Sequence, residues 1–175
     1  MWAFPLLLAV GYECPGSSAP FFHASCKVSA SAGALCSAVR AEMLARVNGQ
    51  FGRWHDPHNN GTYQITDASD AGSLSLQRRT GDGKFTDKLR FVFTDSADGP
   101  CDVQGCSESQ VTSFSDFSTN YCNLRMLYCS SADGCRPVIT DASVSEREVV
   151  ASLGAGHDPS ACLKLKEGVL RSRGL

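Results

Sequence analysis

Apolar and polar residues alternate along much of the chain between Phe51 and Cys129. Alternation of this kind is typical of strands that bury one face and expose the other. The pattern is clearest at 72–80 and 84–95, and Asp82-Gly83 between them is a strong signal for a tight hairpin. We therefore predict two neighbouring antiparallel strands in this part of the chain. Their core-facing residues are Leu74, Leu76, Leu89, Phe91 and Phe93.

Three further segments have a weaker alternation and are also predicted as strands. Short polar stretches separate them, as expected for a sheet whose neighbouring strands follow one another along the chain. The three segments are residues 61–67, 109–117 and 121–129.

Helical spacing occurs at 31–47, where an apolar residue recurs at every fourth position. Asn48-Gly49 follows, and both residues tolerate the left-handed conformation that often ends a helix. A second, shorter helix is predicted at 144–153, whereas residues 20–30 are expected to be irregular. The apolar positions of the first helix are Leu35, Val39, Met43 and Val47.

These elements predict an α+β domain. An N-terminal amphipathic helix is expected to pack on a twisted antiparallel sheet of about five or six strands, and a disulfide-rich C-terminal segment follows. Because the helix and the sheet each have one apolar face, Leu35, Val39 and Val47 are expected to share a core with the hairpin.

The N-terminus begins with a short apolar run that suits a signal peptide and is too short to span a bilayer. We predict a signal peptide at 1–19, one disulfide-stapled domain at 20–165 and a basic tail at 166–175. Small residues suitable for cleavage occur at Ala9-Val10-Gly11 and at Ser17-Ser18-Ala19. The expected location is therefore extracellular, and no other segment is apolar enough to cross a membrane.

The nine cysteines support export, because reducing compartments rarely keep so many thiols. No CxxC pair occurs, which disfavours a zinc site. Cleavage beyond Cys14 would leave an even number of cysteines, so four disulfides and no free thiol are expected. The pairs Cys101–Cys106 and Cys129–Cys135 are close enough to form local loops. The cysteines expected to be bridged are Cys26, Cys36, Cys101, Cys106, Cys122, Cys129, Cys135 and Cys162.

Two short motifs carry candidate chemistry. Imidazole and carboxylate groups occur together at His55, Asp56 and His58, and the His-Asp-Pro sequence recurs at His157. If the two turns met in space, these groups would form a metal site, although Asp-Pro is also a common turn former. Asn60 begins an Asn-Gly-Thr sequence, the acceptor pattern for N-glycosylation in a eukaryotic host.

Other features of the sequence exclude functions and do not assign one. The formal net charge of −2 gives no global attraction to nucleic acid or to anionic membranes. The segment 80–86 lacks the spacing of a phosphate-binding loop, and 105–109 lacks the second glycine of a nucleophile elbow. No catalytic residue and no cofactor are assigned from the sequence.

The leading hypothesis is a monomeric extracellular binding or interaction module without catalysis, because disulfides make loops rigid and rigid loops form binding surfaces. Its partner would be an unknown small molecule or an extracellular protein. One alternative is a small secreted hydrolase, in which a metal ion bound through His55, His58 and His157 would assist the reaction. Another is an inhibitor of extracellular enzymes.

Overall fold

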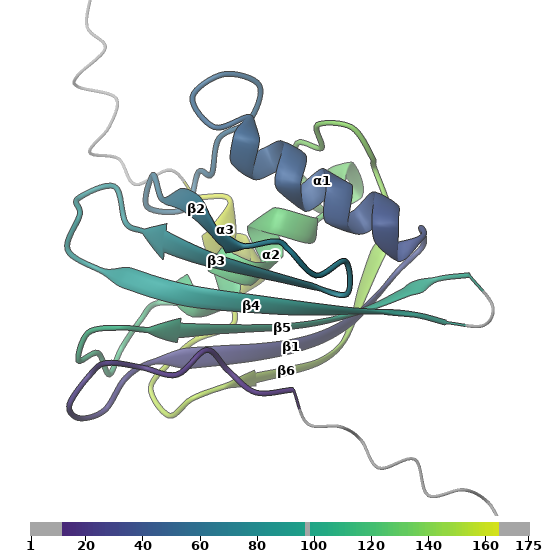
Figure 1. Cartoon of the computed structure of the whole chain (residues 1–175). Coiled ribbons are helices and arrows are strands. Elements are labelled where there is room, and N and C mark those ends of the chain that lie inside the picture. Colours follow the sequence, from purple (N-terminus) through teal and green to yellow (C-terminus); the bar gives the residue numbers. More distant parts are fainter. Residues whose placement is uncertain (1–11, 97–98, 165–175) are drawn as a thin grey trace, which may run out of the picture.

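The computed structural model describes residues 12–96 and 99–164. Within them, a six-stranded antiparallel sheet has the order β2-β3-β4-β5-β1-β6 (Figure 1). Most of the predicted signal peptide and the whole predicted basic tail lie outside the described residues. The strands are β1 (Ser25–Ala32), β2 (Thr62–Asp67), β3 (Ser73–Arg79), β4 (Thr86–Asp95), β5 (Cys101–Ser109) and β6 (Val144–Ala151).

The strands β3 and β4 form where the alternation is strongest, and β2 forms within the predicted segment 61–67, so this part of the prediction is confirmed. All five core-facing residues expected on β3 and β4 are buried, and Phe91 is completely inaccessible. The β3–β4 hairpin turns at Gly83, which adopts a φ of 70°. Glycine adopts this left-handed conformation without steric cost, so the Asp-Gly signal was physically informative.

Four expectations about the other elements are wrong. The segment 20–30, expected to be irregular, contains most of β1, and the segment expected as a strand at 109–117 is a loop after Ser109. The expected strand at 121–129 is helix α2 (Thr119–Tyr128). The expected helix at 144–153 is the edge strand β6, which pairs with β1.

The helices α1 (Cys36–Asn48) and α2 cover the same face of the sheet (Figure 1). Helix α1 is not N-terminal as expected, because β1 precedes it in the chain. Val39, Met43 and Val47 are buried in the shared core, but Leu35 lies before the helix and is 63% exposed.

Close packing of α2 on the sheet requires Gly105 in β5. A Cβ atom at this position would lie 2.9 Å from the Phe91 ring and 3.2 Å from the Leu124 side chain. Leu124 belongs to α2, so glycine lets the helix approach β5 directly above Phe91. A larger residue here would force the helix away from the sheet.

A buried carboxylate fixes the segment after α2 onto α1. Glu42 accepts hydrogen bonds from the backbone N–H groups of residues 138–140 at 2.7–2.8 Å. It also accepts one from Arg46 Nε at 2.7 Å, and Arg46 donates to the carbonyl oxygens of Met126 and Cys129. Burial opposes ionisation of Glu42, but these hydrogen bonds outweigh it and lower its pKa.

Four disulfides join the described elements: Cys14–Cys106, Cys36–Cys101, Cys122–Cys162 and Cys129–Cys135. The expected local pair Cys129–Cys135 is present, whereas Cys101 and Cys106 each have a distant partner. Cys26, which was expected to be bridged, is a buried free thiol. Helix α3 (Pro159–Cys162) is tied to α2 through Cys122.

Strand geometry explains why Cys26 has no disulfide partner. Cys26 is opposite Ser107 in the β1–β5 ladder, so its side chain points toward α2, as Ser107 does. Cys106 is the next residue along β5 and therefore points to the other face of the sheet. There it bonds to Cys14, which belongs to a segment that sequence analysis assigned to the signal peptide.

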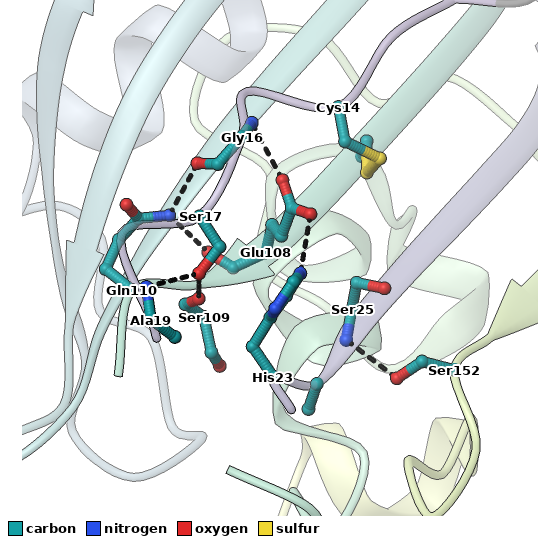
Figure 2. Close-up of polar contacts among 12 residues, drawn as sticks. Cys14, Gly16, Ser17, Ala19, His23, Ser25, Glu108, Ser109, Gln110 and Ser152 are labelled. Carbon is teal, nitrogen blue, oxygen red and sulfur yellow. Dashed lines mark hydrogen bonds and ion pairs between the residues drawn. A yellow bond between two sulfur atoms is a disulfide. The ribbon is translucent and has the colours of Figure 1, made fainter. Parts of the chain in front are cut away.

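The N-terminal segment 12–19 lies on the face of the sheet opposite the helices (Figure 2). Tyr12 donates its hydroxyl proton toward two backbone carbonyls, one on β1 and one on β5, each at 3.1 Å. Glu108 accepts a hydrogen bond from the Gly16 N–H at 2.8 Å and is paired with His23 at 2.9 Å (Figure 2). The expected cut beyond Cys14 would remove this segment and leave Cys106 unpaired.

Candidate functional site

A cleft of about 540 Å³ opens at the end of the sheet where β4 begins and β5 ends. Four parts of the chain form it: the turn at 57–60, the β3–β4 hairpin, the loop after β5 and the first residue of α2. Its lining residues are Pro57, Asn59, Asn60, Thr80, Gly81, Asp82, Phe85, Asp87, Ser109, Ser113, Ser115, Asp116, Phe117 and Thr119.

Asp87 is a buried carboxylate among these lining residues. It lies on β4 with the same alternation as Leu89 and Phe91, so its side chain points toward the helix layer. Its Oδ1 accepts a hydrogen bond from Ser109 Oγ at 2.7 Å, and its Oδ2 accepts one from Asn123 Nδ2 at 2.8 Å. Burial raises the pKa of Asp87 above its ordinary value, and the two hydrogen bonds oppose this only in part.

Asp116 is the second buried carboxylate, and it organises the start of α2. Its Oδ1 accepts from the backbone N–H groups of Ser118 and Gly156, and its Oδ2 accepts from that of Asn120. The Asn120 side chain also donates to Oδ2 at 3.0 Å. Asp116 therefore satisfies N–H groups at the helix N-terminus and draws the segment after β6 toward the cleft.

Two buried asparagines of α2 connect the carboxylates. Asn120 Nδ2 donates to Ser109 Oγ at 3.2 Å as well as to Asp116. Asn123 Nδ2 donates to Asp87 and, at 3.0 Å, to Ser107 Oγ, whereas its buried Oδ1 has no hydrogen-bond partner. A continuous polar network thus lies behind the cleft, between the sheet and α2.

His58 and Thr119 form a hydrogen-bonded pair beside the cleft. His58 Nδ1 lies 3.0 Å from the carbonyl oxygen of Ala161, which can only accept, so Nδ1 carries a proton. In the neutral imidazole, Nε2 is then the acceptor, and it lies 3.3 Å from Thr119 Oγ1. Asn59 Nδ2 donates to the same hydroxyl oxygen at 3.4 Å, so the threonine is held from two sides.

Backbone strain is concentrated around this pair. Asn59 and Asn60 follow His58 with φ values of 56° and 49°, and Phe117 and Ser118 precede Thr119 with values of 50° and 68°. Only one other non-glycine residue in the described chain, Phe51, has a positive φ. Asparagine tolerates this conformation, but it is unfavourable for a bulky residue such as Phe117. Such strain is frequent where structure serves a binding or catalytic site.

A buried ion pair holds the 55–60 turn against strand β3. Arg78 donates from Nε and Nη2 to Asp56 Oδ2 at 2.9 and 2.7 Å, and both side chains are fully buried. Arg78 Nη2 also donates to the carbonyl oxygen of His58. A Cβ atom at Gly61 would lie about 2 Å from this guanidinium, so only glycine fits there.

The structure separates the residues that were considered as a metal site. His55 is exposed, Asp56 is committed to Arg78, and His157 lies edge-on against the Tyr121 ring. The two His-Asp-Pro turns do approach each other, but through His58 and the backbone of Ala161. Within the described residues, no group of three or more histidine, cysteine or acidic side chains is placed to hold a metal ion.

His58 itself is buried, with 5% exposure. The reason is that its turn folds onto α2 and α3. Asn60, the predicted glycosylation acceptor, is half-buried and lines the cleft. Its modification stays a prediction.

Asp87, Asp116 and Thr119 were not predicted from the sequence, although one signal for Asp87 was present. Asp87 occupies a core-facing position of a strand that is otherwise apolar on that side. A charged residue on the apolar face of a strand is uncommon without a partner or a function. Asp116 lies in a segment that was wrongly predicted as a strand, and Thr119 lies between two such segments, so no pattern pointed to them.

No protein family model, curated protein or solved structure matches this chain. Among the residues that the structure describes, no helix is long and apolar enough to cross a membrane.

Proposed function

We propose that the chain is an extracellular binding module whose ligand occupies the cleft between the β3–β4 hairpin and the start of α2. The observation that carries this proposal is a cleft of about 540 Å³ with buried polar groups converging on it. Pockets for small organic ligands typically have volumes of about 300–1,000 Å³ and combine apolar walls with a few placed polar groups. Here Phe85, Phe117 and Pro57 supply the apolar walls.

The charge of the cleft lining restricts the class of ligand that the cleft can bind. The charged groups along the described lining are Asp82, Asp87 and Asp116, and no lysine, arginine or histidine is among them. Acidic side chains at low dielectric repel anions and attract hydrogen-bond donors. The ligand is therefore a neutral or cationic molecule with hydroxyl or amino groups, rather than a phosphate or a carboxylic acid.

The disulfides support the extracellular part of the proposal. Four bridges are typical of a chain that folds in an oxidising compartment. One of them, Cys122–Cys162, ties α3 to α2, whose first residue lines the cleft. A site held rigid in this way loses less conformational entropy on binding.

A hydrolase is the second candidate, and the observation that favours it is the hydrogen bond between His58 Nε2 and Thr119 Oγ1. A histidine base next to a hydroxyl resembles the arrangement of an activated nucleophile. However, an acyl-transfer site also needs N–H donors for the developing oxyanion. The N–H groups of residues 118–120 are all bonded to Asp116, so binding is the better-supported function.

Amide chemical shifts of isotope-labelled protein test the proposal. Neutral, cationic and anionic fragments of similar size are titrated separately. We expect the neutral and cationic fragments to shift amides of the cleft, including those of Gly81 and Phe117, and the anionic fragments to leave them unchanged.

Asp87→Asn should weaken binding of the hydroxyl- and amino-bearing fragments by about ten-fold, the typical effect of losing a hydrogen bond to a charged group. Asp102→Asn is the matched control, because Asp102 lies on the opposite face of β5 from the Asp87 partner Ser109. Shifts confined to residues outside the cleft, with no response to Asp87→Asn, would contradict the proposal.

A further inference from the structure

Large apolar side chains project into solvent next to the cleft. They lie on three loops: 20–24 before β1, 110–118 after β5 and 152–157 after β6. We refer to the four phenylalanines among them as the aromatic rim. They are Phe21, Phe22, Phe114 and Phe117, with exposed fractions of 74%, 79%, 56% and 81%, and Leu153 on the third loop is 86% exposed.

Hydrogen bonds lock the three loops to one another. Ser113 donates from its backbone N–H to the Phe22 carbonyl and accepts from the Ala24 N–H through its hydroxyl oxygen. Ser25 and Ser152 are joined by two hydrogen bonds of 2.9 and 3.0 Å, one of which is drawn in Figure 2. The rim is therefore presented by a fixed backbone, which is the arrangement expected of a binding surface.

The rim is continuous with the cleft. Ser113 and Ser115 line the cleft and flank Phe114, while Phe117 belongs both to the lining and to the rim. Phe114 in turn lies against the loop after β6, since a Cβ atom at Gly154 would be 2.8 Å from its ring. A ligand longer than the cleft would pass from the cleft directly onto these rings.

The chemistry of the combined surface selects one class of ligand. A pyranose ring has an apolar C–H face that packs on an aromatic ring, and its hydroxyl groups both donate and accept hydrogen bonds. The cleft offers a carboxylate acceptor at Asp87, whose two oxygens each accept a single hydrogen bond from the protein, and hydroxyl groups at Ser109 and Thr119. Because the charged groups in the described cleft lining are all acidic, the surface is unsuited to phosphates, nucleic acids and anionic lipids.

We propose that the cleft and the aromatic rim together bind a chain of neutral sugar residues, with one or two sugars in the cleft and the following ones stacked on the rim. This inference rests on the proposed function, because the cleft supplies the first subsite. It adds the ligand class and the prediction that affinity grows with chain length.

Isothermal titration calorimetry with cellohexaose, chitohexaose, mannohexaose and laminarihexaose, each compared with its disaccharide, tests the inference. We expect at least one hexasaccharide to bind about ten-fold more tightly than its disaccharide. Phe114→Ala and Phe22→Ala should each reduce hexasaccharide affinity by about five- to ten-fold, as for a stacked aromatic anchor, and leave disaccharide affinity unchanged. Asp87→Asn should weaken both.

Phe51→Ala is the matched control, because Phe51 is 89% exposed but belongs to neither the cleft lining nor the rim. Equal affinity for hexasaccharide and disaccharide would refute the role of the rim. If no saccharide binds while other neutral fragments shift cleft amides, the saccharide inference fails and the proposed function stands. If the rim variants instead abolish self-association in sedimentation or binding to phosphatidylcholine vesicles, the rim has a different partner and the inference is overturned.

Discussion

Asp87 combines two properties that single residues rarely combine in a strand. It occupies a core-facing position, and its carboxyl group lines the cleft. The position could be predicted from the alternation of β4, because residue 87 has the same parity as Leu89, Phe91 and Phe93. Its partners could not, because Ser109 and Asn123 come from a strand and a helix that the local pattern did not identify.

The raised pKa of Asp87 predicts how stability depends on pH. The folded protein binds this proton more tightly than the unfolded chain, whose aspartate titrates near 3.8. As the pH rises from that value through the folded pKa, the unfolded state loses its proton first and the wild type loses stability. Asp87→Asn does not titrate, so its stability relative to the wild type should increase over this window and then level off. Urea unfolding of both proteins between about pH 3 and 8 measures this difference in stability.

Asp133→Asn provides the opposite case. Partial burial opposes ionisation of Asp133, but hydrogen bonds from Ser130 outweigh it and hold its pKa below the ordinary value. This carboxylate stabilises the fold above its unfolded pKa, and the contribution is lost as the pH falls through the folded one. Asp133→Asn should therefore be less stable than the wild type at neutral pH, with a deficit that shrinks in acid. If the stability of both variants relative to the wild type changed with pH in the same direction, the two pKa assignments would be contradicted.

Among the elements, α2 shows where periodicity fails. Eight of its ten residues are buried, so it has no polar stripe to reveal a helical period. Asn120 and Asn123 are buried because they serve the network behind the cleft, whereas in the sequence they look like surface residues. A helix that is enclosed on all sides cannot be distinguished from a strand by hydrophobic pattern alone.

The strands β1 and β6 were missed for a different reason. In β1 two of the four core positions are the alanines Ala30 and Ala32, which give a weak hydrophobic signal. In β6 the sequence suits a helix, and it becomes a strand because it pairs with β1, more than a hundred residues earlier in the chain. Long-range pairing overrides local preference in such cases.

Glu42 is expected to hold residues 138–140 against α1. Glu42→Ala would leave Arg46 buried without its carboxylate and three backbone N–H groups without an acceptor. Breaking a buried pair in this way typically costs about 3–5 kcal/mol. Hydrogen exchange should accelerate at the amides of residues 138–140. The amides of β3 and β4 should keep the same rank order of exchange rates. Unchanged exchange at 138–140 would show that the segment is held by other contacts.

At the scale of the whole molecule, the disulfides should contribute different amounts to the free energy of unfolding. Cys14–Cys106 joins residues 92 apart in sequence, and Cys129–Cys135 joins residues 6 apart. Chain-entropy arguments give about 4–5 kcal/mol for the longer loop and about 2 kcal/mol for the shorter one. Replacing each pair by serines and comparing urea unfolding curves tests the order. Equal losses would mean that native contacts, rather than loop closure, determine the contribution.

The cysteine pairing also predicts the outcome of a thiol titration. Cys26 should react only after denaturation, because it is buried. Burial, followed by the charges of Asp116 and Glu146, raises its pKa to about 12, so the native thiol is protonated at neutral pH. One thiol per chain is expected in urea without reductant. A value of zero would restore the pairing expected from the sequence, in which Cys14 is removed and Cys26 is bridged.

The place of β1 in the sheet has a consequence for the order of folding. The strands β2 to β5 form a meander of sequence neighbours, which assembles with short loop closures. Strand β1 is synthesised first but lies between β5 and β6, so it waits for nearly the whole chain before it is paired on both sides. During that time the Cys26 thiol is open to oxidation. Correct bridging of Cys106 to Cys14 therefore depends on β1 entering the sheet before the wrong sulfur reacts, and oxidative refolding yields should fall when oxidation is made faster than strand pairing.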